Sequence, residues 1–272
     1  MASQRLVLWF RNDLRLHDNY VIAEAAKMMS SNRKLEVGCQ NVACRIPATS
    51  ARALVLILLA HVPLPWQIVP VYCFDPRHFG TSQYGPRKCG VLRAKFLQES
   101  VLDLKTSLKG IGSDLLVYHG TPESIMPTLM SKDAATTVLA HEETCDEELR
   151  VDRGVRRAIK QLKGDLKLIW GSTLFHKDDL PYNQDLANMP DVFTPFKEGC
   201  EKKSRGVRLC APTPRTLPPL PAELLEKAKD SVPALDALDF SADDVARARK
   251  SDPRSVLAFQ GGETAALGEL CM

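Results

Sequence analysis

The chain has 272 residues, of which 44% are hydrophobic, and its 36 basic and 33 acidic side chains leave a net charge of +3 and a pI near 8.4. This length suits one large core or two small ones, and so mild a charge excludes nucleic-acid binding through a strongly basic surface alone. The eight cysteines form neither a C-x-x-C pair nor the Cys/His spacing of a zinc site, so we expect reduced thiols and no bound metal.

The first expected element is a buried strand that ends in a charged loop. Residues 6–10 (Leu-Val-Leu-Trp-Phe) are an unbroken apolar run, which indicates an inner strand covered on both faces. Arg11 and Asp13 follow where this strand ends, at the edge of a parallel sheet where ligands bind. This loop is therefore a candidate site, and a solvated connection is the alternative. No signal or transit peptide precedes the strand, so we expect an intracellular protein.

A helix is expected after the loop, capped by Asp18 or Asn19, and then the pattern breaks. Residues 30–34 read as a loop, whereas residues 53–60 are uninterrupted apolar side chains. Eight apolar residues are far short of the ~20 that cross a bilayer, so we expect no membrane segment. We interpret residues 28–67 as an atypical insertion.

Strands and helices alternate from residue 68 to residue 170. Strands are expected over 68–74, 114–118, 136–140 and 166–170, and helices over 88–109, from 121 onwards and over 145–163, the last burying Val151, Val155, Ile159 and Leu162. This alternation predicts an α/β fold with a doubly wound, five-stranded parallel sheet. The expected strand positions also place Trp9 and Trp170 in the core.

The regular alternation of strands and helices ends near residue 180. Residues 211–221 contain five prolines and predict an extended connector, followed by short helices over 222–229 and 242–250. No glycine-rich phosphate loop is present, because Gly110 and Gly112 precede a strand instead of following one. An ordinary NAD enzyme and a P-loop NTPase are therefore not expected.

An acidic turn is expected at the end of the fourth strand, where residues 141–148 read His-Glu-Glu-Thr-Cys-Asp-Glu-Glu. Acid at a helix amino terminus complements the helix dipole, which contributes about 0.3–1 kcal/mol per charge. Glu143 and Glu147, four residues apart, are expected to share a helix face.

Several segments resemble the photolyase/cryptochrome family. Residues 9–19 (Trp-Phe-Arg-Asn-Asp-Leu-Arg-Leu-His-Asp-Asn) are similar to its amino-terminal signature, and residues 73–80, 170–176 and 189–197 resemble the DASH-type cryptochromes. Residues 259–267 resemble the start of the family's helical flavin domain. The resemblance covers residues 5–27 and 68–267. It implies that 1–180 are an antenna-binding Rossmann-like domain, 181–250 a linker and 251–272 the truncated start of the helical FAD domain.

This resemblance implies a blue-light flavoprotein or deoxyribodipyrimidine photolyase. In that family FAD donates an electron to a cyclobutane pyrimidine dimer, and DASH types prefer single-stranded DNA. The α/β domain commonly holds an antenna chromophore, often methenyltetrahydrofolate, whose pterin offers an N–H and an amine to one carboxylate. By motif position Glu147 is the first cofactor-binding candidate and Glu143 the second, followed by Arg11, Asp13 and Asp75. The helix-dipole interpretation of the acidic turn stays open.

No residue of the chain matches the family's FAD pocket, its electron-transfer tryptophans or its DNA surface. We therefore expect a monomer that has no catalytic residues, binds DNA weakly or not at all and is not catalytic alone. Two alternatives remain: a stand-alone folate- or nucleotide-binding regulatory module, or the non-functional product of a faulty gene model.

Overall fold

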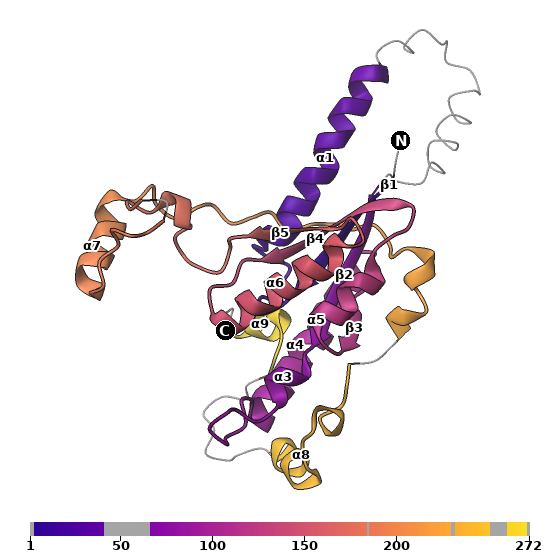
Figure 1. Ribbon diagram of the computed structural model, residues 1–272, viewed down its shortest axis with the longest axis vertical. Coiled ribbons are helices and arrows are strands. Elements are labelled where there is room, and N and C mark those ends of the chain that lie inside the picture. The colour runs from indigo at the N-terminus through magenta and orange to yellow at the C-terminus, as the bar shows by residue number, and fades with distance from the viewer. Residues whose placement is uncertain (1–2, 41–65, 184, 230–231, 251–259, 271–272) are drawn as a thin grey trace.

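A parallel sheet forms the centre of the protein. The computed structural model describes residues 3–40, 66–183, 185–229, 232–250 and 260–270. The strands are β1 (Ser3–Phe10), β2 (Trp66–Phe74), β3 (Leu116–His119), β4 (Ala134–His141) and β5 (Asp165–Ile169). All pair in parallel in the order β3-β2-β1-β4-β5 (Figure 1). The five-stranded, doubly wound α/β fold expected from the sequence is confirmed.

The central strand is β1, because its side chains are apolar on both faces. Leu6 and Leu8 lie in one core cluster, whereas Val7 and Trp9 lie in the other, and all four are buried. β1 pairs with β2 along one edge and with β4 along the other. An unbroken apolar run suits only such a strand, since no side chain of it faces water.

Helices cover both faces of this sheet. Helices α1 (Tyr20–Gln40) and α4 (Val91–Gly110) pack on the face of Leu6 and Leu8, and α5 (Pro122–Ile125), a 3-10 turn (Met126–Leu129) and α6 (Asp146–Lys160) pack on the opposite face. The short α3 (Pro76–Phe79) follows β2 directly. Because all five strands are parallel, the loops that follow them lie at the same edge of the sheet.

The block interpreted as an insertion begins and ends in regular structure. Helix α1 continues as far as Gln40, and Trp66 and Gln67 already belong to β2. Trp66 is buried, and Gln67 Oε1 accepts a 2.8 Å hydrogen bond from Nε of Arg5. Residues 66–67 thus belong to the sheet, and residues 28–40 continue α1. The apolar run at 53–60 lies outside the described residues.

Beyond β5 the chain forms a 3-10 turn (Lys177–Asp179), α7 (Phe193–Lys203), three further 3-10 turns (Ala222–Leu224, Lys227–Lys229, Asp236–Leu238), α8 (Ala242–Arg249) and α9 (Glu263–Leu270). Helix α7, which the sequence interpretation omitted, stands away from the sheet (Figure 1). The proline-rich stretch is extended, as expected, yet Leu217 and Leu220 are buried in opposite core clusters. The connector therefore closes both cores of the domain.

Three local expectations are wrong. The helix expected over 145–163 ends at Lys160, because Lys163 takes a left-handed φ of 60°, and Leu162 is 51% exposed. Trp170 follows β5 and is only half buried, with its Nε1 donating to Oγ1 of Thr173 at 2.8 Å. Two 3-10 turns replace the helix expected over 222–229, although Leu224 and Ala228 are buried in the core as that helix would have placed them.

Candidate functional site

The strand order places the topological switch point of the sheet, where doubly wound folds have their binding crevice, between β1 and β4. From β1 the chain passes to α1 on one face of the sheet, and from β4 it passes to α6 on the other face. In doubly wound sheets, ligands bind where the loops separate in this way, at the carboxyl ends of the strands. Two segments border this point: residues 11–19, the β1–α1 loop, and residues 142–145, the β4–α6 loop.

The β1–α1 loop is held in one shape by its own polar side chains. Arg15 Nε donates to Asp13 Oδ1 at 2.9 Å. Asn19 caps α1, because its Oδ1 accepts from the backbone N–H groups of Val21 and Ile22 at 3.0 and 3.1 Å. Asp18 takes a left-handed φ of 51° instead of capping the helix. The charged side chains Asp13 and Arg15 are therefore paired with each other within the loop.

Arg11 points into the domain. Its Nη1 donates to Oδ1 of Asp152 on α6 at 2.7 Å, and the two side chains are only 8% and 6% exposed. Its guanidinium also lies 4.5 Å from the ring centroid of Trp9. Burial raises the pKa of Asp152 above its ordinary value, although Arg11 opposes this effect. Arg11 thus ties the loop to α6.

Glu143 lies at the crevice, opposite the β1–α1 loop. Asn12 Nδ2 donates to Glu143 Oε1 at 2.9 Å, whereas Glu143 Oε2 has no hydrogen-bond partner among the described residues. The expectation that Glu143 shares a helix face with Glu147 is wrong, because Cys145 is the N-cap and α6 begins at Asp146. Glu143 is therefore a loop residue whose orientation depends on Asn12.

His141 ends β4 beneath this loop and is 5% exposed. Its Nε2 makes no hydrogen bond within the described part of the chain and lies 4.0 Å from Asp13 Oδ2. Burial, reinforced by the positive charges of Arg15 and Arg11, lowers the pKa of His141 to about 4. Burial raises the pKa of Asp13, while Arg15 opposes the rise. Near pH 7 the ring is neutral, so it forms no ion pair with Asp13.

Glu147 lies in the first turn of α6 with its side chain 62% exposed. Lys88 Nζ, from the connection between β2 and α4, donates to its Oε1 at 2.6 Å. This hydrogen bond lowers the pKa of Glu147, so the carboxylate is ionised at neutral pH. No described residue bonds to Oε2 of Glu147. The acidic turn therefore presents an ionised oxygen to solvent at the carboxyl edge of the sheet.

Asp75 follows β2, caps α3 and is buried. Arg77 Nε donates to both of its carboxylate oxygens at 2.9 and 3.0 Å, and the Arg77 guanidinium also binds Glu123 on α5. Burial raises the pKa of Asp75, but the hydrogen bonds from Arg77 outweigh this and leave it below its ordinary value. A ligand at Asp75 would have to displace Arg77.

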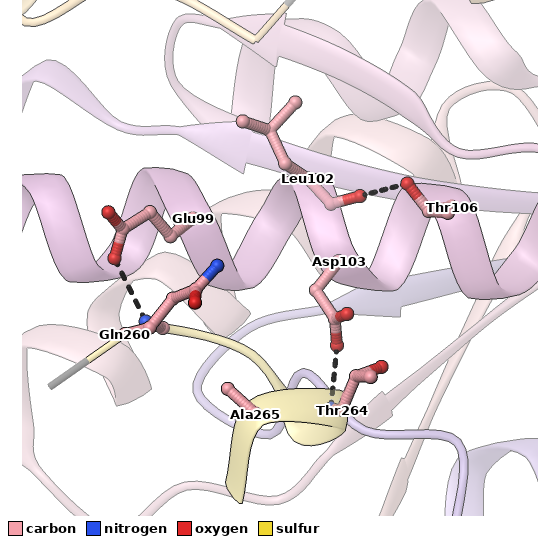
Figure 2. Close-up of a pocket in the computed structure, with 8 residues that line it drawn as sticks. Glu99, Leu102, Asp103, Thr106, Gln260, Thr264 and Ala265 are labelled. Atoms are coloured by element: carbon pink, nitrogen blue, oxygen red, sulfur yellow. Dashed lines mark hydrogen bonds between the residues drawn. The ribbon is translucent and has the colours of Figure 1, made fainter. Parts of the chain in front are cut away.

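An open hollow of about 310 Å³ lies between α4 and α9 (Figure 2). It is lined by Glu99, Leu102, Asp103, Thr106, Gln260, Gly261, Thr264 and Ala265. Its two carboxylates already accept hydrogen bonds from the backbone N–H groups of Gly261 and Thr264. The described ranges contain no cluster of three metal-ligating side chains and no helix long and apolar enough to cross a membrane.

Comparison with known proteins identifies the family. The profile of the DNA photolyase family matches residues 6–221. The chain belongs to the DNA photolyase family. Within the family it is similar to the cryptochrome DASH of Gloeobacter violaceus, with 35% identity over 99% of this chain and 44% of that protein. It is also 36% identical to the chloroplastic/mitochondrial cryptochrome DASH of Oryza sativa, over 97% of this chain and 40% of that protein.

The crystal structure of a Synechocystis cryptochrome matches this photolyase-family chain with a TM-score of 0.72 at 34% identity. The match covers 99% of this chain and 46% of the cryptochrome. The chain thus spans less than half the length of the relatives it matches. The five-stranded sheet corresponds to the amino-terminal α/β domain of the photolyase/cryptochrome family.

Sequence reasoning missed three partners in this photolyase-family domain. Asn12 was quoted within the signature but not paired with Glu143, and Lys88 was not assigned to Glu147. The third is Glu263 of α9, which accepts hydrogen bonds from the β1–α1 loop. No local signal marks these pairs, because 59 or more positions separate the partners along the chain.

Proposed function

We propose that this chain is the antenna-binding part of a DASH-type cryptochrome. In this proposal residues 1–180 are the antenna domain, 181–250 the linker and 251–272 the start of a helical domain that holds FAD. The whole protein is a blue-light flavoprotein that splits cyclobutane pyrimidine dimers, preferentially in single-stranded DNA. Support comes from the family match and from relatives named cryptochrome DASH. The FAD and DNA sites are assigned to the length of those relatives beyond this match.

The antenna we propose is methenyltetrahydrofolate, which supplies absorption of near-ultraviolet and blue light when it is bound. The observation that supports this ligand is the pair of glutamates at the carboxyl edge, Glu143 and Glu147, each with one oxygen free of protein partners among the described residues. A carboxylate offers about four acceptor positions, so the bonds from Asn12 and Lys88 leave room for two pterin donors. The residues present therefore fit the group.

The two glutamates have different roles in this arrangement. Lys88 lowers the pKa of Glu147 and orients its side chain at the start of α6, where it can accept donors from a ligand at the edge of the sheet. Asn12 fixes Glu143 at the crevice. Arg11 and Asp13 shape the loop behind these acceptors, and Asp75 with Arg77 closes the far side of the same edge.

Titration of methenyltetrahydrofolate into the purified chain, followed by its near-ultraviolet absorbance, tests the proposal. Glu147→Gln should weaken binding about 10- to 100-fold, because a hydrogen bond to a charged acceptor contributes about 1.5–3 kcal/mol. Glu143→Gln should weaken it by less, since Glu143 is the second candidate by motif position and lies in the loop before α6. Gln keeps the size of the side chain but turns an amide donor towards the pterin donors.

Glu148→Gln is the matched control, because Glu148 lies in the same first turn of α6 and its replacement removes the same charge from the helix terminus. Its affinity should stay within about twofold of the parent. Equal effects of Glu147→Gln and Glu148→Gln would show that the acidic turn serves the helix dipole only. Binding that is unchanged in both Glu147→Gln and Glu143→Gln would move the site to Arg11 or Asp75.

A further inference from the structure

Helix α9 is joined to the β1–α1 loop by one side chain. Glu263 Oε2 accepts from the backbone N–H of Leu16 at 2.8 Å, and Oε1 contacts the backbone N–H and the Nδ1 of His17 at 3.1 and 2.9 Å. The Glu263 side chain is only 13% exposed, although it begins a helix of eight residues. A single carboxylate thus satisfies two loop amides that lie 246 and 247 positions away.

The other side of α9 rests on α4 (Figure 2). Glu99 Oε2 accepts from the N–H of Gly261 at 2.9 Å, and Asp103 Oδ2 accepts from the N–H of Thr264 at 3.1 Å. Gly261 has no room for a side chain, because a Cβ there would overlap the backbone oxygen of Phe96. Helix α9 is therefore fixed at two places, on α4 and on the loop.

The same loop touches the candidate antenna site at its other end. Asn12, four residues before Leu16, donates to Glu143 across the crevice. The internal ion pair of Arg15 with Asp13 stiffens the segment between these two contacts. The loop is therefore a short, braced connection between Glu143 at one end and Glu263 at the other.

We propose that the β1–α1 loop couples the Glu143 site to α9, and that Glu263 is the positioning residue of this coupling. A ligand that binds Glu143 and shifts its side chain alters the hydrogen bond from Asn12. Because the loop is braced, the displacement of Asn12 extends to the backbone amides that bind Glu263. Coupling between two sites is reciprocal, so the docking of α9 also biases the orientation of Asn12 and Glu143. The identity of the ligand rests on the proposed function, whereas the coupling itself rests on these contacts.

Amide hydrogen exchange measured by NMR on the full chain tests the proposal in the first direction. Glu263→Ala should raise the exchange rates of the Leu16 and His17 amides about tenfold or more, because both lose a charged acceptor. The Asn12 side-chain amide should also exchange faster. Glu263→Gln keeps one acceptor oxygen and should give an intermediate rate at one of the two amides. Glu269→Ala, an exposed carboxylate on the same helix, is the control and should leave the loop unchanged.

The reverse direction uses changes at the far end of the loop. Asn12→Ala should raise exchange at the α9 amides of Ala266 and Leu267 severalfold, although Asn12 does not touch α9. A purely structural role of Glu263 would not produce this response. Gly261→Ala gives a second way to displace α9 without removing a charge, and it should loosen the loop amides as Glu263→Ala does.

Two results would overturn the coupling: parental exchange at Leu16 and His17 in Glu263→Ala, or parental exchange in α9 when Asn12 is replaced. Added methenyltetrahydrofolate should slow exchange in α9 of the parent but not of Glu263→Ala. If the parent binds none of this folate, the proposed function fails, and the variants without ligand still decide whether the coupling exists.

Discussion

The buried ring of His141 predicts a specific loss of stability in mild acid. The side chain is 5% exposed, and its Nε2 has no hydrogen-bond partner in the described part of the chain. Protonation would bury a positive charge near Arg11 and Arg15, and the carboxylate of Asp13 at 4.0 Å is already engaged by Arg15. Burial and these two cations lower the pKa of His141 from 6.5 to about 4.

The direction of this pH dependence follows from proton binding in the folded and unfolded states. Between pH 6.5 and about 4 the unfolded chain binds a proton at His141 that the folded chain excludes, so the free energy of unfolding falls as the pH falls. The stabilisation is fully present above pH 6.5 and is lost as the pH falls towards 4. At about 1.36 kcal/mol per pH unit, the loss is about 2 kcal/mol at pH 5 and about 3 kcal/mol below pH 4.

Urea unfolding of the parent and of His141→Gln at pH 7 and pH 5 measures this effect. His141→Gln lacks the imidazole ring at both pH values and therefore shows no loss of stability from protonation of that ring. The difference in unfolding free energy between the parent and His141→Gln should therefore be about 2 kcal/mol smaller at pH 5 than at pH 7. His78→Gln, which replaces an exposed histidine at the same edge, is the control. A difference between parent and His141→Gln that is the same at both pH values would refute the reasoning.

Two further predictions follow from the same region. Arg11→Met should lower the free energy of unfolding, measured in urea, by about 3–5 kcal/mol, because it leaves Asp152 buried and unpaired. The double variant Arg11→Met with Asp152→Leu should lose less than the sum of the two single losses. Additive losses would show that the pair does not interact. The purified chain should bind no FAD and repair no thymine dimers, since the proposed function assigns the FAD site to the length of the relatives beyond this match. Stoichiometric flavin absorbance after desalting would contradict this expectation.

The sheet could be predicted from the sequence because inner parallel strands appear there as short, continuous apolar segments. Residues 6–10 and 68–74 are almost wholly apolar, and both segments are buried on two faces. Helix α4 was equally clear, since Val101, Leu104 and Leu108 repeat on one face and are all buried. In these elements the local pattern and the tertiary burial agree, so the fold followed from the residues alone.

The sequence placed the start of α6 within one residue, at 145 instead of Asp146, but it did not show which acidic side chains lie on the helix. Cys145 is the N-cap and makes no side-chain capping bond, whereas Thr144, a better capping residue, lies one position earlier. The acidic run spans both loop and helix, so residue type does not separate its loop members from its helix members. As a result Glu143 was assigned to the helix, although it lies in the loop and its position is set by Asn12, 131 residues earlier in the chain.

The charges of the β1–α1 loop illustrate why composition alone misleads at such a site. Read along the chain, Arg11, Asp13 and Arg15 look like a solvated turn, yet Arg11 is buried against α6 and Arg15 braces Asp13 within the loop. Asp18 accepts the N–H of Ala211 from the connector at 2.7 Å, so the linker is held by the same loop. Because α6, the connector and α9 all bind this one segment, moving it would cost several contacts at once. A loop held in this way can present Asn12 in a fixed geometry, which a binding site at the crevice requires.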